Sequence, residues 1–236
     1  MSDGRREALT HSDLQRLRAV TLFAPLPPEA LDALLGAAVA LAAPPFSVLF
    51  EQEQEAEHLA VVLDGMVGLM AAVGEHDSCL IELVAPGQVI GEAGLFDSGR
   101  YPVAARAVTE VRLALIPASL VRDHLDAHAG LRRHMLGFQS ARLRVLVRQL
   151  AQLTLMTAAQ RLGSFLLGLA PRRAGPQTIR LACERRLIAG MLGMTPESLS
   201  RSLRQLRELG VRGEGRRDVV VEDPERLRAF VAGETS

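Results

Sequence analysis

The sequence predicts an α+β chain with three parts: an antiparallel β-barrel of the jelly-roll type, a long helix, and a C-terminal winged helix-turn-helix. Three observations lead to this prediction. Short β-rich segments separated by turn signals fill residues 46–117, a leucine stripe runs through residues 136–157, and a capped helix pair occupies residues 183–210. We therefore divide the chain into residues 1–128, 129–157 and 158–236.

The first part begins with helical character and then changes to strands. Leucines recur at helical spacing after Pro27-Pro28, so residues 13–40 are expected to be helical. Six strands are then expected, at residues 47–50, 58–63, 67–72, 79–83, 104–107 and 112–116. Asp64-Gly65, Pro86-Gly87 and Ser98-Gly99 supply turns between them. Many short strands at this spacing favour a small antiparallel barrel.

The helix pair has the pattern of a helix-turn-helix that reads DNA. Gly193 breaks the first helix, Thr195 is a good N-cap, and Pro196 stands where its missing N–H costs nothing. Leucines line one side of the second helix, and polar residues line the other. The residues expected to contact DNA are Thr195, Glu197, Ser198, Ser200, Arg201 and Arg204 on this helix, and Arg212 and Arg216 on the basic hairpin that follows. The alternative is a tight helical hairpin without this role.

Composition and charge agree with a DNA-binding protein. The chain has 236 residues, is 48% hydrophobic and has a formal net charge of zero. However, residues 158–236 hold 14 arginines and nine acidic residues, a local charge of +5.

A segment of about 18 apolar residues and a signal peptide are both lacking, so no membrane partner is expected. The chain has only two cysteines, Cys79 and Cys183. We therefore expect no disulfide framework, and we expect a cytoplasmic location. No hydrolase, nucleotide-binding or metal motif points to an enzyme.

The long helix carries a stripe of leucines at spacings of three and four. The helix either packs on its own domain or forms a coiled coil between two copies. We favour the coiled coil, because a two-fold symmetric protein reads both halves of a palindromic DNA site. The expected dimer interface comprises Leu136, Leu143, Leu146, Leu150 and Leu153.

This order of parts resembles the catabolite-activator and fumarate-nitrate-reduction regulator (CRP/FNR) family. Residues 90–96, Ile-Gly-Glu-Ala-Gly-Leu-Phe, are similar to the opening of that family's phosphate cassette, and residues 193–206 to its recognition segment. The resemblance implies a homodimer that binds double-stranded DNA, contacts RNA polymerase and holds a small effector in the barrel. The effector pocket would comprise Gly91, Glu92, Leu95, Arg100 and Tyr101.

The identity of the effector follows less directly from the resemblance. Members that bind cyclic AMP place an Arg-Ser or Arg-Thr pair against the cyclic phosphate, and the aligned positions here are Tyr101 and Pro102. We therefore expect weak or absent binding of cyclic AMP. Two cysteines cannot ligate a four-cysteine iron–sulfur cluster within one subunit. Residues 101–105, 187–190 and 196–198 resemble the nitric-oxide and nitrogen-oxide responsive branch (DNR and NnrR-like regulators), some of which are thought to use haem. A haem iron would take His58, His76 or Cys79 as its axial ligand.

The polar edge of the second helix indicates the DNA sequence that is read. Glu197, Ser200 and Arg201 match the Glu-x-x-Ser-Arg pattern of the oxygen-responsive branch, so the resemblance implies an inverted repeat of TTGAT-like half-sites. Three alternatives remain open: a regulator that responds to a cyclic nucleotide, a dimer that binds DNA without any effector, and a cyclic-nucleotide-binding module with no DNA function.

Overall fold

The computed structural model describes residues 4–73, 77–96, 98–170, 175–181, 184–214 and 217–233. Its contacts divide the chain into two compact units, Met1–Arg142 and Leu143–Ser236. The boundary falls inside the long helix α4 (Ala129–Leu155), so the helix contributes residues to both units.

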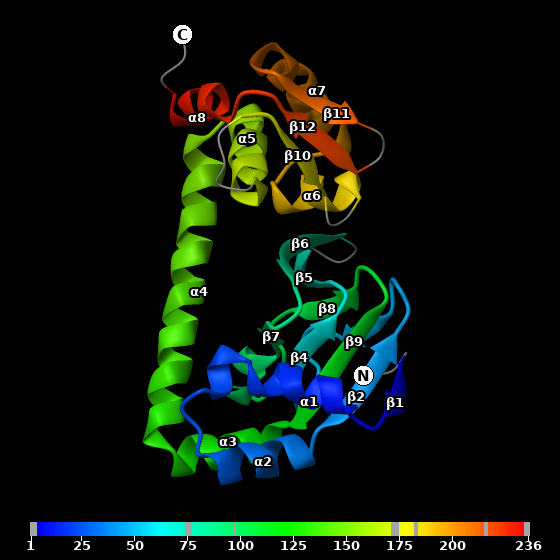
Figure 1. The fold of residues 1–236 in the computed structure, drawn as a ribbon, viewed down its shortest axis with the longest axis vertical. Coiled ribbons are helices and arrows are strands. Elements are labelled where there is room, and N and C mark those ends of the chain that lie inside the picture. Colours follow the sequence, from blue (N-terminus) through cyan, green and yellow to red (C-terminus); the bar gives the residue numbers. More distant parts are fainter. Residues whose placement is uncertain are drawn as a thin grey trace. The chain divides into compact units, whose positions relative to one another are not determined.

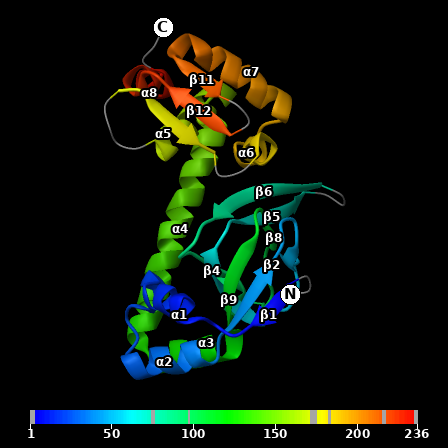
Figure 2. The same cartoon turned by 45° about the vertical axis from the view of Figure 1, so that its right-hand side comes forward.

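Two antiparallel sheets form the β-rich part of the first unit, as the sequence predicts (Figure 2). The five-stranded sheet has the order β1-β2-β9-β4-β7 and the four-stranded sheet the order β3-β8-β5-β6. The strands are β1 (Arg5–Glu7), β2 (Val39–Ala43), β3 (Val48–Phe50), β4 (His58–Asp64), β5 (Val67–Val73), β6 (Asp77–Val84), β7 (Val89–Ile90), β8 (Ala104–Ala107) and β9 (Val111–Pro117). All six expected strands are present, and β1, β2 and β7 are additional.

The five-stranded sheet is buried on both faces, and this explains the continuous apolar run of β4. Alternate residues of a strand point to opposite faces. Ala60 and Val62 belong to the core between the two sheets, whereas Leu59 and Val61 belong to a second core between the sheet and the helices. We call these the inter-sheet core and the helix-side core.

Four helical segments cover the outer face of the five-stranded sheet (Figure 1). They are α1 (His11–Arg18), the 3₁₀ turn η1 (Thr21–Phe23), α2 (Pro28–Gly36) and α3 (Ala118–Ala127). The expectation of helix throughout residues 13–40 is wrong in two respects. Residues 19–20 and 24–27 are not helical, and Val39–Ala43 is strand β2. A strand buried on both faces lacks the alternation that would have separated it from helix.

A break separates α3 from α4 at His128, whose backbone is extended (φ −119°, ψ 98°). Two separate helices therefore follow strand β9. Within the described part of the chain, no helix combines the length and the apolar character that crossing a membrane requires.

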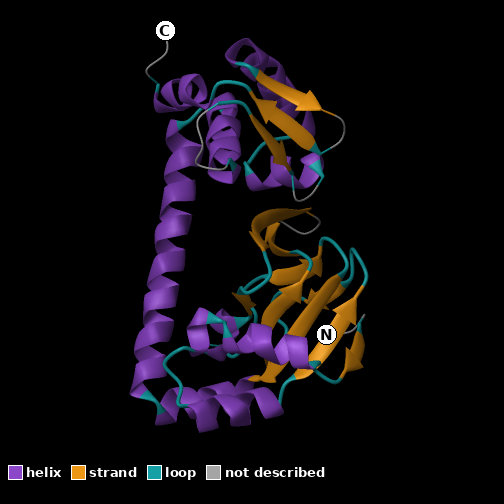
Figure 3. Cartoon of the chain, viewed as in Figure 1, coloured by secondary structure: helices purple, strands orange, loops and turns teal. Residues whose placement is uncertain are grey.

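The second unit contains the predicted winged helix-turn-helix (Figure 3). It comprises the end of α4, α5 (Ala158–Leu169), β10 (Gln177–Arg180), α6 (Arg185–Met191), α7 (Pro196–Leu206), the 3₁₀ turn η3 (Arg207–Leu209), β11 (Val211–Glu214), β12 (Asp218–Val221) and α8 (Pro224–Ala232). A capping box opens α5, because the side chains of Thr157 and Gln160 each accept a hydrogen bond from the other's backbone N–H. The strands order as β10-β12-β11.

Candidate DNA-binding and effector sites

Helix α7 presents a polar edge because its opposite side is anchored in the core. Thr195 Oγ1 accepts a hydrogen bond from the Ser198 N–H at 3.2 Å, and Pro196 occupies the first helical position. Leu199 and Leu206 are buried. The remaining face exposes Glu197, Ser200, Arg201 and Arg204, while Ser198 is half-buried.

The polar edge carries one fixed negative group and two arginines. A hydrogen bond from its own backbone N–H lowers the pKa of Glu197, so this carboxylate is ionised at neutral pH. The Ser200 hydroxyl donates to the Pro196 carbonyl at 2.9 Å. Neither Arg201 nor Arg204 has an ion pair or hydrogen bond within the described residues, so both guanidinium groups are available to an external acceptor.

The hairpin that follows α7 contributes less than the sequence suggested. Arg212 on β11 is exposed, but its Nε lies 3.2 Å from Oε1 of Glu222. A phosphate would therefore compete with this carboxylate for the guanidinium group. Arg216 lies outside the described residues, and the neighbouring Arg217 is exposed.

Arg161 on α5 holds the turn of the helix-turn-helix, a role that sequence reasoning missed. Its Nε donates to the Leu192 carbonyl at 2.9 Å and its Nη2 to the Gly193 carbonyl at 3.4 Å. Its Nη1 donates to the carbonyl of Met156 at 2.9 Å, at the end of α4. Gly193 has φ +61°, and a Cβ there would lie 2.6 Å from Cδ2 of Leu153 on α4. The turn is thus tied to the last turn of α4 from two directions.

In the first unit, the cassette of residues 90–96 contains one partner of a buried ion pair. Glu92 lies in η2 (Glu92–Leu95), and its Oε1 accepts from Nη1 of Arg142 at 2.6 Å. Nη2 of the same arginine donates to Oε2 of Glu82 at 2.7 Å. Burial raises the pKa of Glu92, and the charge of Arg142 offsets part of that rise. The sequence did not predict these contacts, because Arg142 lies 50 residues from Glu92 and 60 residues from Glu82.

Tyr101 fills space inside the barrel instead of pointing to solvent. It is 2% exposed, its ring stacks on Phe50 with centroids 3.8 Å apart, and its hydroxyl donates to the His58 carbonyl at 2.8 Å. Gly91 lies against it, because a Cβ at that position would be 2.9 Å from Cε1 of Tyr101.

The other two expected pocket residues lie elsewhere. Arg100 is exposed, and its Nη1 donates to the Glu53 carbonyl at 2.6 Å. Leu95 packs in the helix-side core, whereas Tyr101 packs in the inter-sheet core. Of the five expected residues, the structure thus brings Gly91 and Tyr101 into contact and places Glu92 beside Arg142.

The suggested haem ligands do not converge. His58 is on β4 in the five-stranded sheet and is half-buried, and burial is the main cause of its lowered pKa. Cys79 is exposed on β6 in the four-stranded sheet, and His76 lies outside the described residues. Across the described residues, no group of histidine, cysteine and acidic side chains is arranged to hold a metal ion.

Helix α4 leaves its leucine stripe uncovered by its own chain. Leu136, Leu143, Leu146, Leu150 and Leu153 are between 40% and 69% exposed. Large apolar side chains gathered along one exposed helix face mark an interaction surface.

Comparisons with known proteins agree with this arrangement. Residues 160–230 match the Crp-like helix-turn-helix domain, and residues 41–128 match the cyclic nucleotide-binding domain. The nitrogen fixation regulation protein FixK of Azorhizobium caulinodans is 33% identical over 171 residues, which cover 70% of this chain and 67% of FixK.

Two solved structures extend the likeness over nearly the whole chain. A Ruegeria pomeroyi protein, provisionally described as cyclic nucleotide binding, is 33% identical with a TM-score of 0.64 and covers 94% of this chain and 99% of its own. DNR from Pseudomonas aeruginosa is 25% identical with a TM-score of 0.52 and covers 95% of this chain and 100% of its own. The chain therefore belongs to the CRP/FNR family, and it is a DNA-binding transcriptional regulator with an effector-binding domain.

Proposed function

We propose that this regulator binds, as a homodimer, an inverted repeat of TTGAT-like half-sites, under the control of a small effector in its first unit. The observation that carries the proposal is the exposed edge of α7, where Glu197, Ser200 and Arg201 stand beside an N-capped helix terminus. The N-terminal residues of a recognition helix are those that reach base edges in the major groove.

The three side chains supply complementary readout. The guanidinium of Arg201 can donate two hydrogen bonds to O6 and N7 of a guanine, and the ionised Glu197 can accept from a cytosine amino group. Ser200 can serve a thymine or a phosphate. Arg204 and Arg212, with Arg216 if it lies on the same face, are assigned to phosphates, where they add affinity without discrimination.

Dimer formation is supported by the exposed leucine stripe of α4. A second copy packed along the same stripe would bury these side chains, each contributing about 1.5–3 kcal/mol when fully removed from water. The isologous pairing would also present two α7 helices related by a two-fold axis, which matches a palindromic operator.

The effector is proposed to differ from cyclic AMP. Glu92 is already paired with Arg142, and Glu82 brings a second carboxylate to the same guanidinium. A cyclic phosphate placed there would meet excess negative charge and would lose hydration without a full counter-charge. Effector binding would act by shifting the population of conformers of the dimer, with a coupling free energy of about 1–3 kcal/mol.

Binding to labelled DNA duplexes tests the proposal directly. The full chain should shift a TTGAT inverted repeat at concentrations that leave a scrambled duplex free, and light scattering should give the mass of two chains. Equal affinity for both duplexes would contradict the operator assignment.

Three further measurements separate the alternatives. Micromolar binding of cyclic AMP in calorimetry would favour the cyclic-nucleotide alternative, and operator affinity that no candidate ligand changes would favour an effector-free dimer. A Soret band that shifts with nitric oxide would favour haem. RNA polymerase recruitment is tested by transcription from a promoter that carries the operator.

A further inference from the structure

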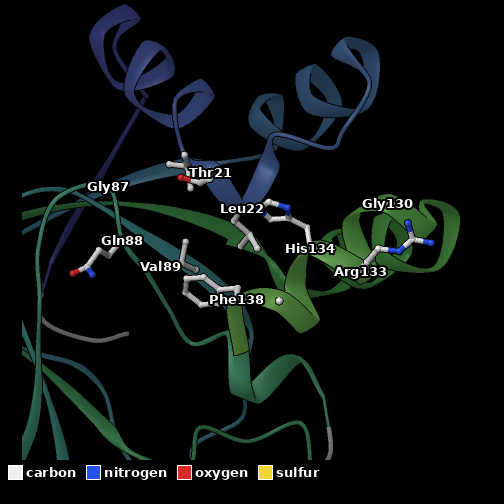
Figure 4. Close-up of a pocket in the computed structure, with 11 residues that line it drawn as sticks. Thr21, Leu22, Gly87, Gln88, Val89, Gly130, Arg133, His134 and Phe138 are labelled. Carbon is white, nitrogen blue, oxygen red and sulfur yellow. The ribbon is translucent and has the colours of Figure 1, made fainter. Parts of the chain in front are cut away.

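A cavity of about 540 Å³ opens on the helix side of the five-stranded sheet, away from the cassette (Figure 4). Its walls come from η1, the turn between β6 and β7, and the first half of α4. Its apolar lining consists of Val20, Leu22, Val89 and Phe138, and Figure 4 shows Leu22, Val89 and Phe138 gathered around it. The volume lies in the range of sites for small molecules.

None of the cassette residues 90–96 lines the cavity. Val89 lines the cavity and packs in the helix-side core. Its neighbour Ile90 points to the opposite face and packs with Tyr101 in the inter-sheet core. Glu92 and Arg142 are likewise absent from the lining.

Two glycines of α4 keep the cavity open. Gly130 and Gly137 both line it and are two helical turns apart. A Cβ at Gly137 would meet nothing within 4 Å, so the space in front of it is unfilled by the protein. Gly137 is itself exposed, so this space opens to solvent.

The charge of the lining indicates the ligand. Arg133 and His134 come from α4 and supply N–H donors, and no acidic side chain is among the described residues of the lining. An apolar body would fit against the four hydrophobic side chains, and an anionic end would meet the guanidinium. We infer that this cavity binds a small apolar anion, such as a medium-chain carboxylate, as a second effector site.

The cavity and the leucine stripe share helix α4. At about 100° per residue, His134 and Phe138 lie about 160° around α4 from Leu136, and Arg133 lies about 60° from it. The ligand would therefore contact the same helix that pairs the two chains. The inference requires only the first unit, so it stands or falls independently of the operator contacts.

Calorimetric titration of the full chain with decanoate, below its micelle concentration, tests the site. Decan-1-ol, which has the same chain length without the charge, is the comparison ligand. Gly137→Leu fills the cavity, and Gly137→Ala controls for the gain in helix propensity. Arg133→Glu reverses the charge at the rim, and Arg144→Glu makes the same change further along α4, at a residue that does not line the cavity.

The expected result is saturable binding of one decanoate per chain, with decan-1-ol bound at least about tenfold more weakly. Gly137→Leu and Arg133→Glu should each weaken decanoate binding at least about tenfold, and the two control variants should stay within about threefold of the parent. Absence of saturation, equal affinity for the alcohol, or equal affinity in all variants would overturn the inference. Operator binding, measured on the same variants without ligand, should be unchanged, and this separates failure of the site from failure of the proposed function.

Discussion

At the scale of single residues, Arg201 carries the most specific of the proposed DNA contacts. Its guanidinium is exposed on α7 and has no partner among the described residues. Arg201→Ala should lower the affinity for the operator by about 1–3 kcal/mol and relax discrimination at the guanine position. Fluorescence anisotropy with operators that vary at this one base pair measures both effects.

Arg204→Ala is the matched control for that measurement. Because Arg204 is proposed to contact a phosphate, its replacement should lower affinity about equally for all duplexes. It should also reduce the dependence of the binding constant on salt. Base selectivity that survives Arg201→Ala unchanged would refute the assignment of Arg201.

A second residue-scale prediction concerns stability in acid. Nη2 of Arg112 lies 2.8 Å from Oδ2 of the buried Asp13, and this hydrogen bond is the main reason that the pKa of Asp13 falls from 3.8 to about 2. Because the folded-state pKa is depressed, the stabilisation is fully present above pH 3.8 and is lost as the pH falls toward 2. It amounts to about 2 kcal/mol.

Chemical denaturation of the parent and of Asp13→Asn between pH 6 and pH 2 checks this. The difference in unfolding free energy between the two proteins should shrink through the acid range. Asp32→Asn, which removes an exposed partner of Arg18, should show little pH-dependent difference. A constant difference for Asp13→Asn would contradict the linkage.

Residues whose partners are close in sequence are the ones that sequence reasoning predicts well. Thr195 and Thr157 cap helices that begin at the next residue, so the signal is contained in four consecutive positions. Arg142 pairs with carboxylates 50 and 60 residues away, and Arg161 reaches the turn carbonyls 31 and 32 residues away, so no local pattern reveals these contacts. Their roles depend on the packing of elements that only the fold brings together.

At the scale of elements, α5 supports the turn between α6 and α7 through Arg161. Arg161→Ala should leave two carbonyls of the turn without this donor and reduce operator affinity about tenfold, while the helical content stays the same. Because Arg161 is proposed to position the helix and not to touch phosphate, the salt dependence of binding should be unchanged.

Hydrogen exchange tests whether Arg161 positions the turn between α6 and α7. The amide of Met194, which donates to the Ala189 carbonyl across the turn, should exchange faster in Arg161→Ala. Arg161→Lys should recover part of the affinity, since an ammonium group can reach one carbonyl at a time. Loss of affinity together with a smaller salt slope would instead indicate a phosphate contact.

Helix α4 makes the second prediction at this scale. Leu143 is 61% exposed on the stripe, and Leu143→Glu should convert the proposed dimer to monomer by burying a charge at the interface. Val145 is 43% exposed on roughly the opposite side of the helix, so Val145→Glu is the matched control. Sedimentation velocity should show a monomer only for Leu143→Glu; equal masses for the two variants would contradict the stripe as the interface.

The pattern of strand β2 explains why the sequence predicted helix up to residue 40. Residues 39–43 are apolar throughout, since Leu41 faces the inter-sheet core and the opposite face of the strand is covered as well. A short apolar run of this kind does not distinguish strand from helix. Strands β4 and β5, which flank the Asp64-Gly65 turn signal, were predicted to within one residue at each end.

At the scale of the whole molecule, charge is divided along the chain. Residues 158–236 hold the excess of arginine, and the first 157 residues hold 13 arginines and 18 acidic residues, a charge of −5. An acidic first part repels DNA, so phosphate contacts are expected only from the C-terminal part. The proposed operator contacts lie in the second unit of the fold, and both candidate effector sites lie in the first.

The operator itself tests whether both copies of the chain act together. If two α7 helices held by α4 bind one inverted repeat, their spacing is set by the protein, and the half-site centres must follow it at about one helical turn of DNA. Inserting about five base pairs between the half-sites turns the second one to the opposite side of the duplex. Affinity should then fall to that of a duplex with a single half-site, a loss of tenfold or more. Anisotropy titrations of the parent and of Leu143→Glu on all three duplexes measure this, and the monomeric variant should bind them with equal affinity. A parent protein that tolerates the insertion without loss would show that the two copies do not engage one operator as a rigid pair.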